Sequence, residues 1–227
     1  MGAFVLIHGG AHGSWCWDRL VPHLAAAPGV DDVLAVDLPG RGARPDDPPS
    51  DEIGIGHFVD AVVGDVEAHG LDDVVLVGHS LAGLTLGPAS ARLGDRVRRV
   101  VHVSTSVPPP GRTMFEHLDD PRSPLSREVD VEAMFCSDLD DETSEWLRSH
   151  LGPEPIGPMS EIVQPVALPA DLPVTYVVLT EDRALPPDYQ REQAATAGAS
   201  EIVEFAAGHS AFASRPADLA ALLARYA

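Results

Sequence analysis

The chain has 227 residues, of which 44% are hydrophobic and 22% are charged, and its formal net charge is −20 at pH 7. This length and apolar content fit one sizeable globular domain with a core of its own. The negative charge argues against a nucleic-acid partner, because such binding rests on basic patches that face phosphate groups.

The sequence also argues against membranes and metals. No apolar run reaches the roughly 18 residues that span a bilayer, and Ala3–Ile7 is too short for the apolar part of a signal peptide. We therefore expect a cytoplasmic protein without a membrane partner. Cys16 and Cys136 form neither a disulfide framework nor a metal-ligand spacing, and the histidines form no ligand cluster. We expect neither a metal nor a cofactor.

Short apolar strands alternate with helical patterns in the first half of the chain. Strands are expected over residues 3–7, 32–36, 74–77 and 97–103, and helices over residues 17–27, 56–69 and 80–93. This alternation is typical of an α/β protein with a mostly parallel sheet and helices on both faces.

The alternation breaks between Pro108 and about Pro173, where proline and acidic residues are frequent and two short helices are expected, at 130–136 and 140–151. It resumes with a strand at 174–180, a helix at 187–197, a strand at 201–205 and a helix at 216–226. We predict a core formed by residues 1–110 and 171–227, with residues 111–170 inserted as a small helical cap. Neither half of the core has enough strands to close a sheet alone.

The segment Gly78-His79-Ser80-Leu81-Ala82 lies between an expected strand and an expected helix. It differs by one residue from the G-x-S-x-G nucleophile elbow, which puts a serine on a strained strand-to-helix turn. Small residues are needed there, and Ala82 is the next smallest choice after glycine. Gly-His-Ser occurs again at 208–210, but no histidine follows Ser210 to act as its base. Ser80 is therefore the predicted nucleophile.

A serine hydroxyl needs an adjacent base, and that base needs an orienting acid, in the chain order serine, acid, histidine. His209 follows an expected strand, whereas the other histidines after Ser80 lie within a strand or in the cap. Asp182 follows the 174–180 strand and is the predicted acid, with Glu181 and then Asp188 as the alternatives. His79 is expected to point away from the nucleophile.

An oxyanion hole needs two donors aimed at the developing negative charge. The Leu81 N–H directly follows the nucleophile, and Gly10 lies in the glycine-rich loop after the first strand, so these two N–H groups are predicted. His8 and His12 are expected to structure that loop. Trp15 and Trp17 are expected to pack the first helix against the sheet.

Four segments together resemble the α/β-hydrolase superfamily: Phe4–Trp17, Gly78–Gly83, Thr180–Pro186 and Gly208–Ser210. More narrowly, they resemble the branch of plant methyl-salicylate-type esterases, hydroxynitrile lyases and bacterial relatives, some of which hydrolyse pyrethroid esters. The resemblance implies the α/β-hydrolase fold, a Ser80–Asp182–His209 triad, an oxyanion hole from Gly10 and Leu81, and a small cap over the serine. It covers essentially the whole chain.

Two departures bear on the reaction. Hydroxynitrile lyases of this branch carry a threonine where Gly10 stands and a lysine where Ser210 stands, so the resemblance disfavours cyanohydrin cleavage. The cap is shorter than in the plant members, so their substrate preference does not carry over.

We therefore predict a carboxylesterase that cleaves small to medium apolar esters through an acyl-enzyme, with a small-molecule ester as its partner. The alternatives are a lyase, cyclase or dehydratase that uses the same triad, and a small-molecule receptor; a homodimer is left open. The predicted substrate pocket comprises Ala11, Met114, Phe115, Met134, Phe135 and Trp146, joined by Leu118 and Leu147. The alternative for the apolar cap residues is that they only attach the cap to the core.

Overall fold

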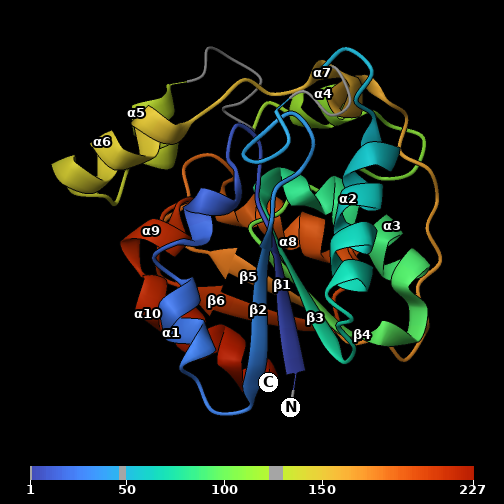
Figure 1. The fold of residues 1–227 in the computed structure, drawn as a ribbon. Coiled ribbons are helices and arrows are strands. Elements are labelled where there is room, and N and C mark those ends of the chain that lie inside the picture. Colours follow the sequence, from blue (N-terminus) through green and yellow to red (C-terminus); the bar gives the residue numbers. More distant parts are fainter. Residues whose placement is uncertain (1, 46–49, 123–129) are drawn as a thin grey trace.

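A computed structural model describes residues 2–45, 50–122 and 130–227. At its centre lies a six-stranded sheet with the strand order β2-β1-β3-β4-β5-β6, in which every neighbouring pair is parallel (Figure 1). The strands are β1 (Gly2–Ile7), β2 (Val30–Val36), β3 (Val74–His79), β4 (Val97–Val103), β5 (Val174–Leu179) and β6 (Glu201–Phe205). The predicted α/β fold is confirmed.

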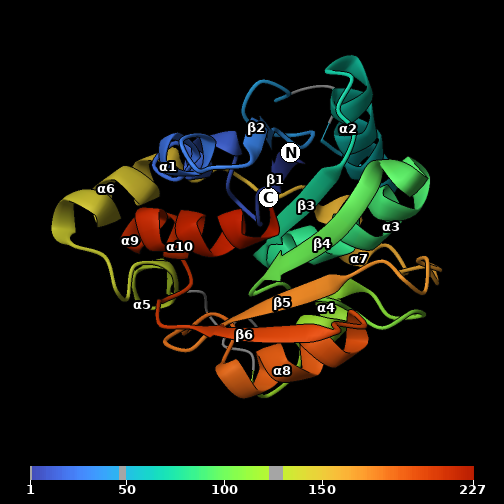
Figure 2. The same ribbon diagram turned by 90° about the horizontal axis from the view of Figure 1, so that it is seen from below.

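Helices cover both faces of the sheet, because successive side chains of a strand point to opposite sides. Phe4 and Leu6 of β1 pack with α1 (Val21–Ala25), α9 (Ala211–Ser214) and α10 (Pro216–Leu223). Val5 and Ile7 pack with α2 (Ile55–Ala68) and α3 (Gly83–Leu93) on the other face. Figure 2 shows α1 and α10 separated from α2 and α3 by the sheet. α8 (Pro187–Thr196) packs against β5.

The first predicted helix differs from the structure. Residues 17–27 were expected to form one helix, but a 3-10 turn spans Ser14–Trp17 and the short α1 begins at Val21. Pro22 occupies the first turn of α1, where its missing N–H costs no hydrogen bond, so the helix starts there. The helix expected at 216–226 ends at Leu223 and continues as a 3-10 turn over Ala224–Tyr226.

Four short helices follow β4 and precede β5: α4 (Met114–Leu118), α5 (Val131–Phe135), α6 (Asp141–His150) and α7 (Ile156–Ser160). They lie beyond the carboxyl ends of the strands, towards the top of Figure 1. The helices expected at 130–136 and 140–151 match α5 and α6, whereas α4, α7 and α9 were not predicted. The boundaries of the cap at 111 and 170 stay a prediction. Within the described ranges, no helix is both long enough and apolar enough to cross a membrane.

Candidate active site

Ser80 lies on a strained turn at the carboxyl end of β3. Its φ angle is +52°, and the chain passes directly into a 3-10 turn, Ser80–Ala82, and then into α3. A Cβ on Gly78 would lie 2.7 Å from Leu86 Cδ1 and 3.0 Å from Ala82 Cβ. Because Gly78 has no side chain, the methyl group of Ala82 fits where the motif has its second glycine.

The structure brings the predicted serine, histidine and acid together. The Nε2 atom of His209 lies 3.1 Å from Ser80 Oγ, and its Nδ1 atom lies 2.7 Å from Asp182 Oδ2. Asp182 follows β5 and His209 follows β6, which are neighbouring strands. The alternative acids Glu181 and Asp188 are exposed. A nucleophile, a base and an orienting carboxylate in hydrogen-bond contact can transfer an acyl group.

The Asp182 carboxylate is held by further donors that sequence reasoning missed. Its Oδ1 atom accepts the Ala184 and Leu185 N–H groups at 2.7 and 2.8 Å, and Ser104 Oγ donates to Oδ2 at 2.6 Å. Gln190 is fully buried and bonds the backbone of the same loop at Leu179 and Leu185. The one available signal for Ser104 was its place just after β4, at the edge of the sheet where the site lies.

The His209 loop is fixed from two sides. His79 Nε2 donates to the His209 carbonyl at 2.9 Å, and Asp138 of the cap accepts the Gly208 N–H at 2.7 Å. Burial holds the pKa of His79 well below its usual range, so this ring is neutral. Its bond to the His209 backbone agrees with the expectation that this ring points away from the nucleophile. Ser210, the rejected nucleophile, is fully buried.

The predicted oxyanion donors lie beside the serine. Gly10, Ser80 and Leu81 line one cavity, and among the described residues the Gly10 N–H donates to no other group. His12 Nδ1 donates to the Gly10 carbonyl at 2.6 Å, which orients the loop, and burial lowers the pKa of His12 to about 4. His8 accepts the Leu38 N–H, and burial lowers its pKa to about 3. Both rings are therefore neutral structural groups.

The cavity has a volume of about 830 Å³. Its walls are mainly apolar, with carboxylates at the cap side; the described lining residues are Gly10, Ala11, Ser80, Leu81, Ser106, Phe115, Glu116, Leu118, Asp119, Val131, Phe135, Leu151, Gly152, Glu154 and Met159. The predicted pocket residues Ala11, Phe115, Phe135 and Leu118 are among them. The carboxylates, and above all Glu154, were not predicted.

Four predicted pocket residues lie outside this lining: Met114, Met134, Trp146 and Leu147. Met114 and Met134 are buried next to Phe115 and Phe135, and neighbouring helix residues project about 100° apart, so only one of each pair faces the cavity. Trp146 instead stacks edge-on against Trp15, with 5.3 Å between ring centroids. Trp15 thus contacts the cap helix α6, in addition to the packing expected for it.

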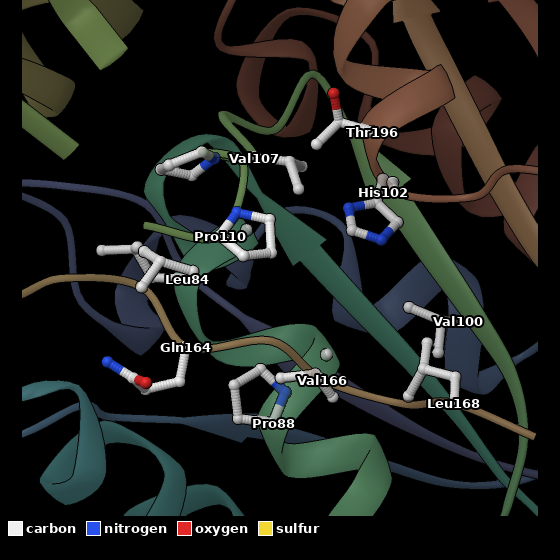
Figure 3. Close-up of a pocket in the computed structure, with 15 residues that line it drawn as sticks. Leu84, Pro88, Val100, His102, Val107, Pro110, Gln164, Val166, Leu168 and Thr196 are labelled. Atoms are coloured by element: carbon white, nitrogen blue, oxygen red, sulfur yellow. The ribbon is translucent and has the colours of Figure 1, made fainter. Parts of the chain in front are cut away.

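Figure 3 shows a second, smaller cavity of about 130 Å³, and Ser80 is not among the described residues that line it. Leu84 and Pro88 of α3, His102 of β4 and the 163–168 segment form its walls. The His102 ring is buried, its Nδ1 atom lies 2.7 Å from Thr105 Oγ1, and burial lowers its pKa to about 3. His102 lies in β4, as expected, and its buried ring is neutral.

Comparison with protein families identifies the family to which the chain belongs. The model described as "Alpha/beta hydrolase family" matches residues 4–222. The chain belongs to this family. A family member of known structure, an extracellular alpha/beta-hydrolase from a Paenibacillus species, superimposes with a TM-score of 0.85 at 21% identity, covering 100% of this chain and 99% of that one. This similarity shows that the two share a fold.

Curated relatives place the chain in the predicted branch of the family. Methylesterase 3 of Arabidopsis thaliana is 28% identical, and the match covers 96% of this chain and 93% of that protein. The rice protein "Probable esterase PIR7A" is 37% identical over 122 residues, which is 52% of this chain but 44% of the relative. The chain therefore spans less than half the length of that rice relative and nearly the whole length of the methylesterase. The resemblance to the methylesterase branch is confirmed.

Proposed function

We propose that the chain is a carboxylesterase that cleaves small to medium apolar esters through an acyl-enzyme. The observation that carries the proposal is the contact series from Ser80 Oγ through His209 to Asp182, at the wall of the 830 Å³ cavity. The esterase names of the rice and Arabidopsis relatives support the same reaction class.

In the acylation step, Ser80 Oγ attacks the ester carbonyl while its proton passes to His209 Nε2. The Asp182 carboxylate keeps the Nδ1–H tautomer of the ring and stabilises the imidazolium that forms. The Gly10 and Leu81 N–H groups receive the negative charge of the tetrahedral intermediate. The intermediate then expels the alcohol, which takes the proton from His209 and leaves the acyl group on Ser80.

In the second step, a water molecule replaces the alcohol. His209 removes a proton from this water, which attacks the acyl carbonyl, and the same two N–H groups stabilise the second intermediate. Collapse of that intermediate releases the carboxylic acid and returns the proton to Ser80. Both half-reactions use the same donors and the same base, so the site needs no rearrangement between them.

The cavity walls indicate the substrate class. Leu81, Phe115, Phe135 and Met159 offer apolar surface, which favours hydrocarbon acyl or alcohol groups. Glu116, Asp119 and Glu154 stand at the same walls, and their charges disfavour an ester that carries a carboxylate. We therefore expect neutral esters to be the preferred substrates. A cytoplasmic location stays a prediction, and a homodimer stays an open alternative.

A p-nitrophenyl ester series with the wild type and Ser80→Ala tests the proposal. We expect turnover by the wild type, abolished turnover by the variant, and covalent labelling of the wild type by a fluorophosphonate. If the wild type neither turns over any ester nor takes the label, the protein is no serine hydrolase. Saturable ligand binding without turnover would then favour the receptor alternative.

A further inference from the structure

A short stretch of the cap, Gly152–Pro155, lies against the oxyanion loop. The Gly152 N–H donates to the Ala11 carbonyl at 2.9 Å, and the Ala11 N–H donates to Glu154 Oε2 at 2.7 Å. Ala11 directly follows Gly10 and has a φ angle of +59°, a conformation that L side chains rarely adopt. Both backbone polar groups of this strained residue are thus bonded to the cap.

Glu154 is itself held by a buried cation. Its Oε1 atom forms an ion pair with Arg41, whose side chain is only 3% exposed, against 22% for Glu154. Arg41 belongs to the turn after β2, and Pro155 packs so closely on this turn that a Cβ on Gly40 would lie 2.7 Å from Pro155 Cγ. Burial raises the pKa of the Glu154 carboxyl, and the Arg41 charge opposes that rise. The carboxylate is therefore fixed by the core on one side and bonded to the oxyanion loop on the other.

The same carboxylate limits the space around Gly10. A Cβ on Gly10 would lie 3.1 Å from Glu154 Oε2 and 3.2 Å from Leu81 Cδ2, which is tighter than most real contacts. Glu154 therefore leaves little room for a side chain at the residue whose N–H we assign to the oxyanion hole. The Ala11 N–H that Glu154 accepts belongs to the Gly10–Ala11 peptide, so this carboxylate fixes the peptide that directly follows the Gly10 N–H.

We infer that Glu154, anchored by Arg41, is a positioning residue for the oxyanion hole, so that docking of the cap on the core completes the catalytic site. This inference rests on the proposed esterase function. It predicts that Glu154 affects the stabilisation of the transition state more than the binding of the substrate, because the Gly10 N–H receives charge only after attack has begun.

The test compares Glu154→Ala, Glu154→Gln and the matched control Glu161→Ala. Glu161 is also a cap carboxylate that accepts a core backbone N–H, that of Ile55 at 2.8 Å, but it does not line the cavity. Each variant is assayed with a p-nitrophenyl ester and with its thionoester. The thiono sulfur is a larger and weaker hydrogen-bond acceptor than oxygen, so its turnover depends less on a well-placed oxyanion hole.

For Glu154→Ala we expect kcat on the oxygen ester to fall roughly 10- to 100-fold, less than the loss of a whole oxyanion donor, with KM nearly unchanged. The loss on the thionoester should be much smaller. Glu154→Gln should recover only part of the activity, because its single amide oxygen can serve either Arg41 or the Ala11 N–H, and its NH₂ group faces the other donor. Glu161→Ala should behave like the wild type.

Glu154→Ala leaves Arg41 buried without its partner, which destabilises a fold. The comparison is therefore repeated in an Arg41→Met background, where no buried cation is left unpaired and the amide oxygen of Glu154→Gln is free to accept the Ala11 N–H. In this background the inference predicts that Glu154→Ala has a lower kcat than Glu154→Gln on the oxygen ester, and that the two variants differ much less on the thionoester. Equal losses on both esters, or a raised KM with an unchanged kcat, would overturn it.

Hydrogen exchange at the Ala11 amide separates this inference from the proposed function. Exchange should be faster in Glu154→Ala than in the wild type and unchanged in Glu161→Ala. If the wild type fails to hydrolyse esters, the proposed function fails, and with it the catalytic part of the inference. Exchange at Ala11 that does not respond to Glu154→Ala contradicts the positioning role even in an active esterase.

Discussion

Replacing Asp182 by asparagine should move the ring proton of His209 from Nδ1 to Nε2. Oδ1 of Asp182 accepts two backbone N–H groups, from Ala184 and Leu185, and neither can accept a hydrogen bond in return. The asparagine oxygen must therefore occupy this place, and its NH₂ group takes the place of Oδ2, which lies 2.7 Å from His209 Nδ1. The Ser104 hydroxyl also faces Oδ2, and it can turn to accept from the amide.

The imidazole cannot adapt in the same way. Nδ1 can accept from the amide only when it carries no proton, which puts the proton on Nε2, the atom that faces Ser80 Oγ. A protonated Nε2 cannot take the serine proton. By analogy with the same replacement in other serine triads, we expect kcat to fall by about 10⁴, which corresponds to about 5 kcal/mol of lost transition-state stabilisation.

The assay is p-nitrophenyl ester hydrolysis at neutral pH, with thermal unfolding as a check on the fold. Asp182→Asn should unfold near the wild-type temperature, because the amide keeps a partner for each of its contacts. Glu181→Gln is the matched control, since Glu181 is exposed next to the same position, and it should retain full activity. A folded Asp182→Asn variant with more than about a tenth of the wild-type kcat would refute the tautomer argument.

Three further predictions concern the surroundings of the site. Gly9→Ala should lower kcat by about 100-fold, because its Cβ would lie 2.8 Å from Ser80 Cβ and would displace the nucleophile; an unchanged kcat would contradict this contact. Asp138→Ala removes the acceptor of the Gly208 N–H and should lower kcat by about tenfold. Asp140 caps α6 and, among the described residues, forms no hydrogen bond with the His209 loop, so Asp140→Ala should leave kcat unchanged. Equal effects of the two substitutions would contradict a specific role for Asp138. His102 has its pKa lowered to about 3 by burial and is neutral in the folded state, while the unfolded state takes up a proton near pH 6.5, so stability is lost as the pH falls. The free energy of unfolding, measured with urea at several pH values between 6 and 4, should therefore fall less steeply with falling pH in His102→Gln than in the wild type, by about 1.4 kcal/mol per pH unit. An equal dependence on pH in the two proteins would refute this.

The sheet and the meeting of Ser80, His209 and Asp182 could be predicted because local patterns indicate them. The strands β1, β3 and β5 are short, mostly apolar runs followed by turns, and a serine, an acid and a histidine stand in the required order at the ends of β3, β5 and β6. Such signals need only a few neighbouring residues. The short helix α4 had a signal as well, since Thr113 and Glu116 form a capping box, but five residues are too few for a helical period.

The residues that hold the site in place could not be predicted from such local patterns. Ser104 reaches Asp182 across 78 positions, and Ala11 meets Glu154 across 143. No local pattern links such residues, because the fold of the sheet and the cap alone brings them together. The pocket prediction failed at Met114 and Met134 for a related reason: apolar character indicates burial, but the rotation of a one-turn helix decides which side chain faces the cavity.

The most direct test of the central claim is to trap the acyl-enzyme. The protein is mixed with an excess of p-nitrophenyl acetate and quenched with acid during turnover, and its peptides are analysed by mass spectrometry. The account predicts one acetyl group on the peptide that contains Ser80, and none at this peptide in Ser80→Ala. Turnover of the ester with no acyl group on Ser80, or with the acyl group on another residue, would contradict it.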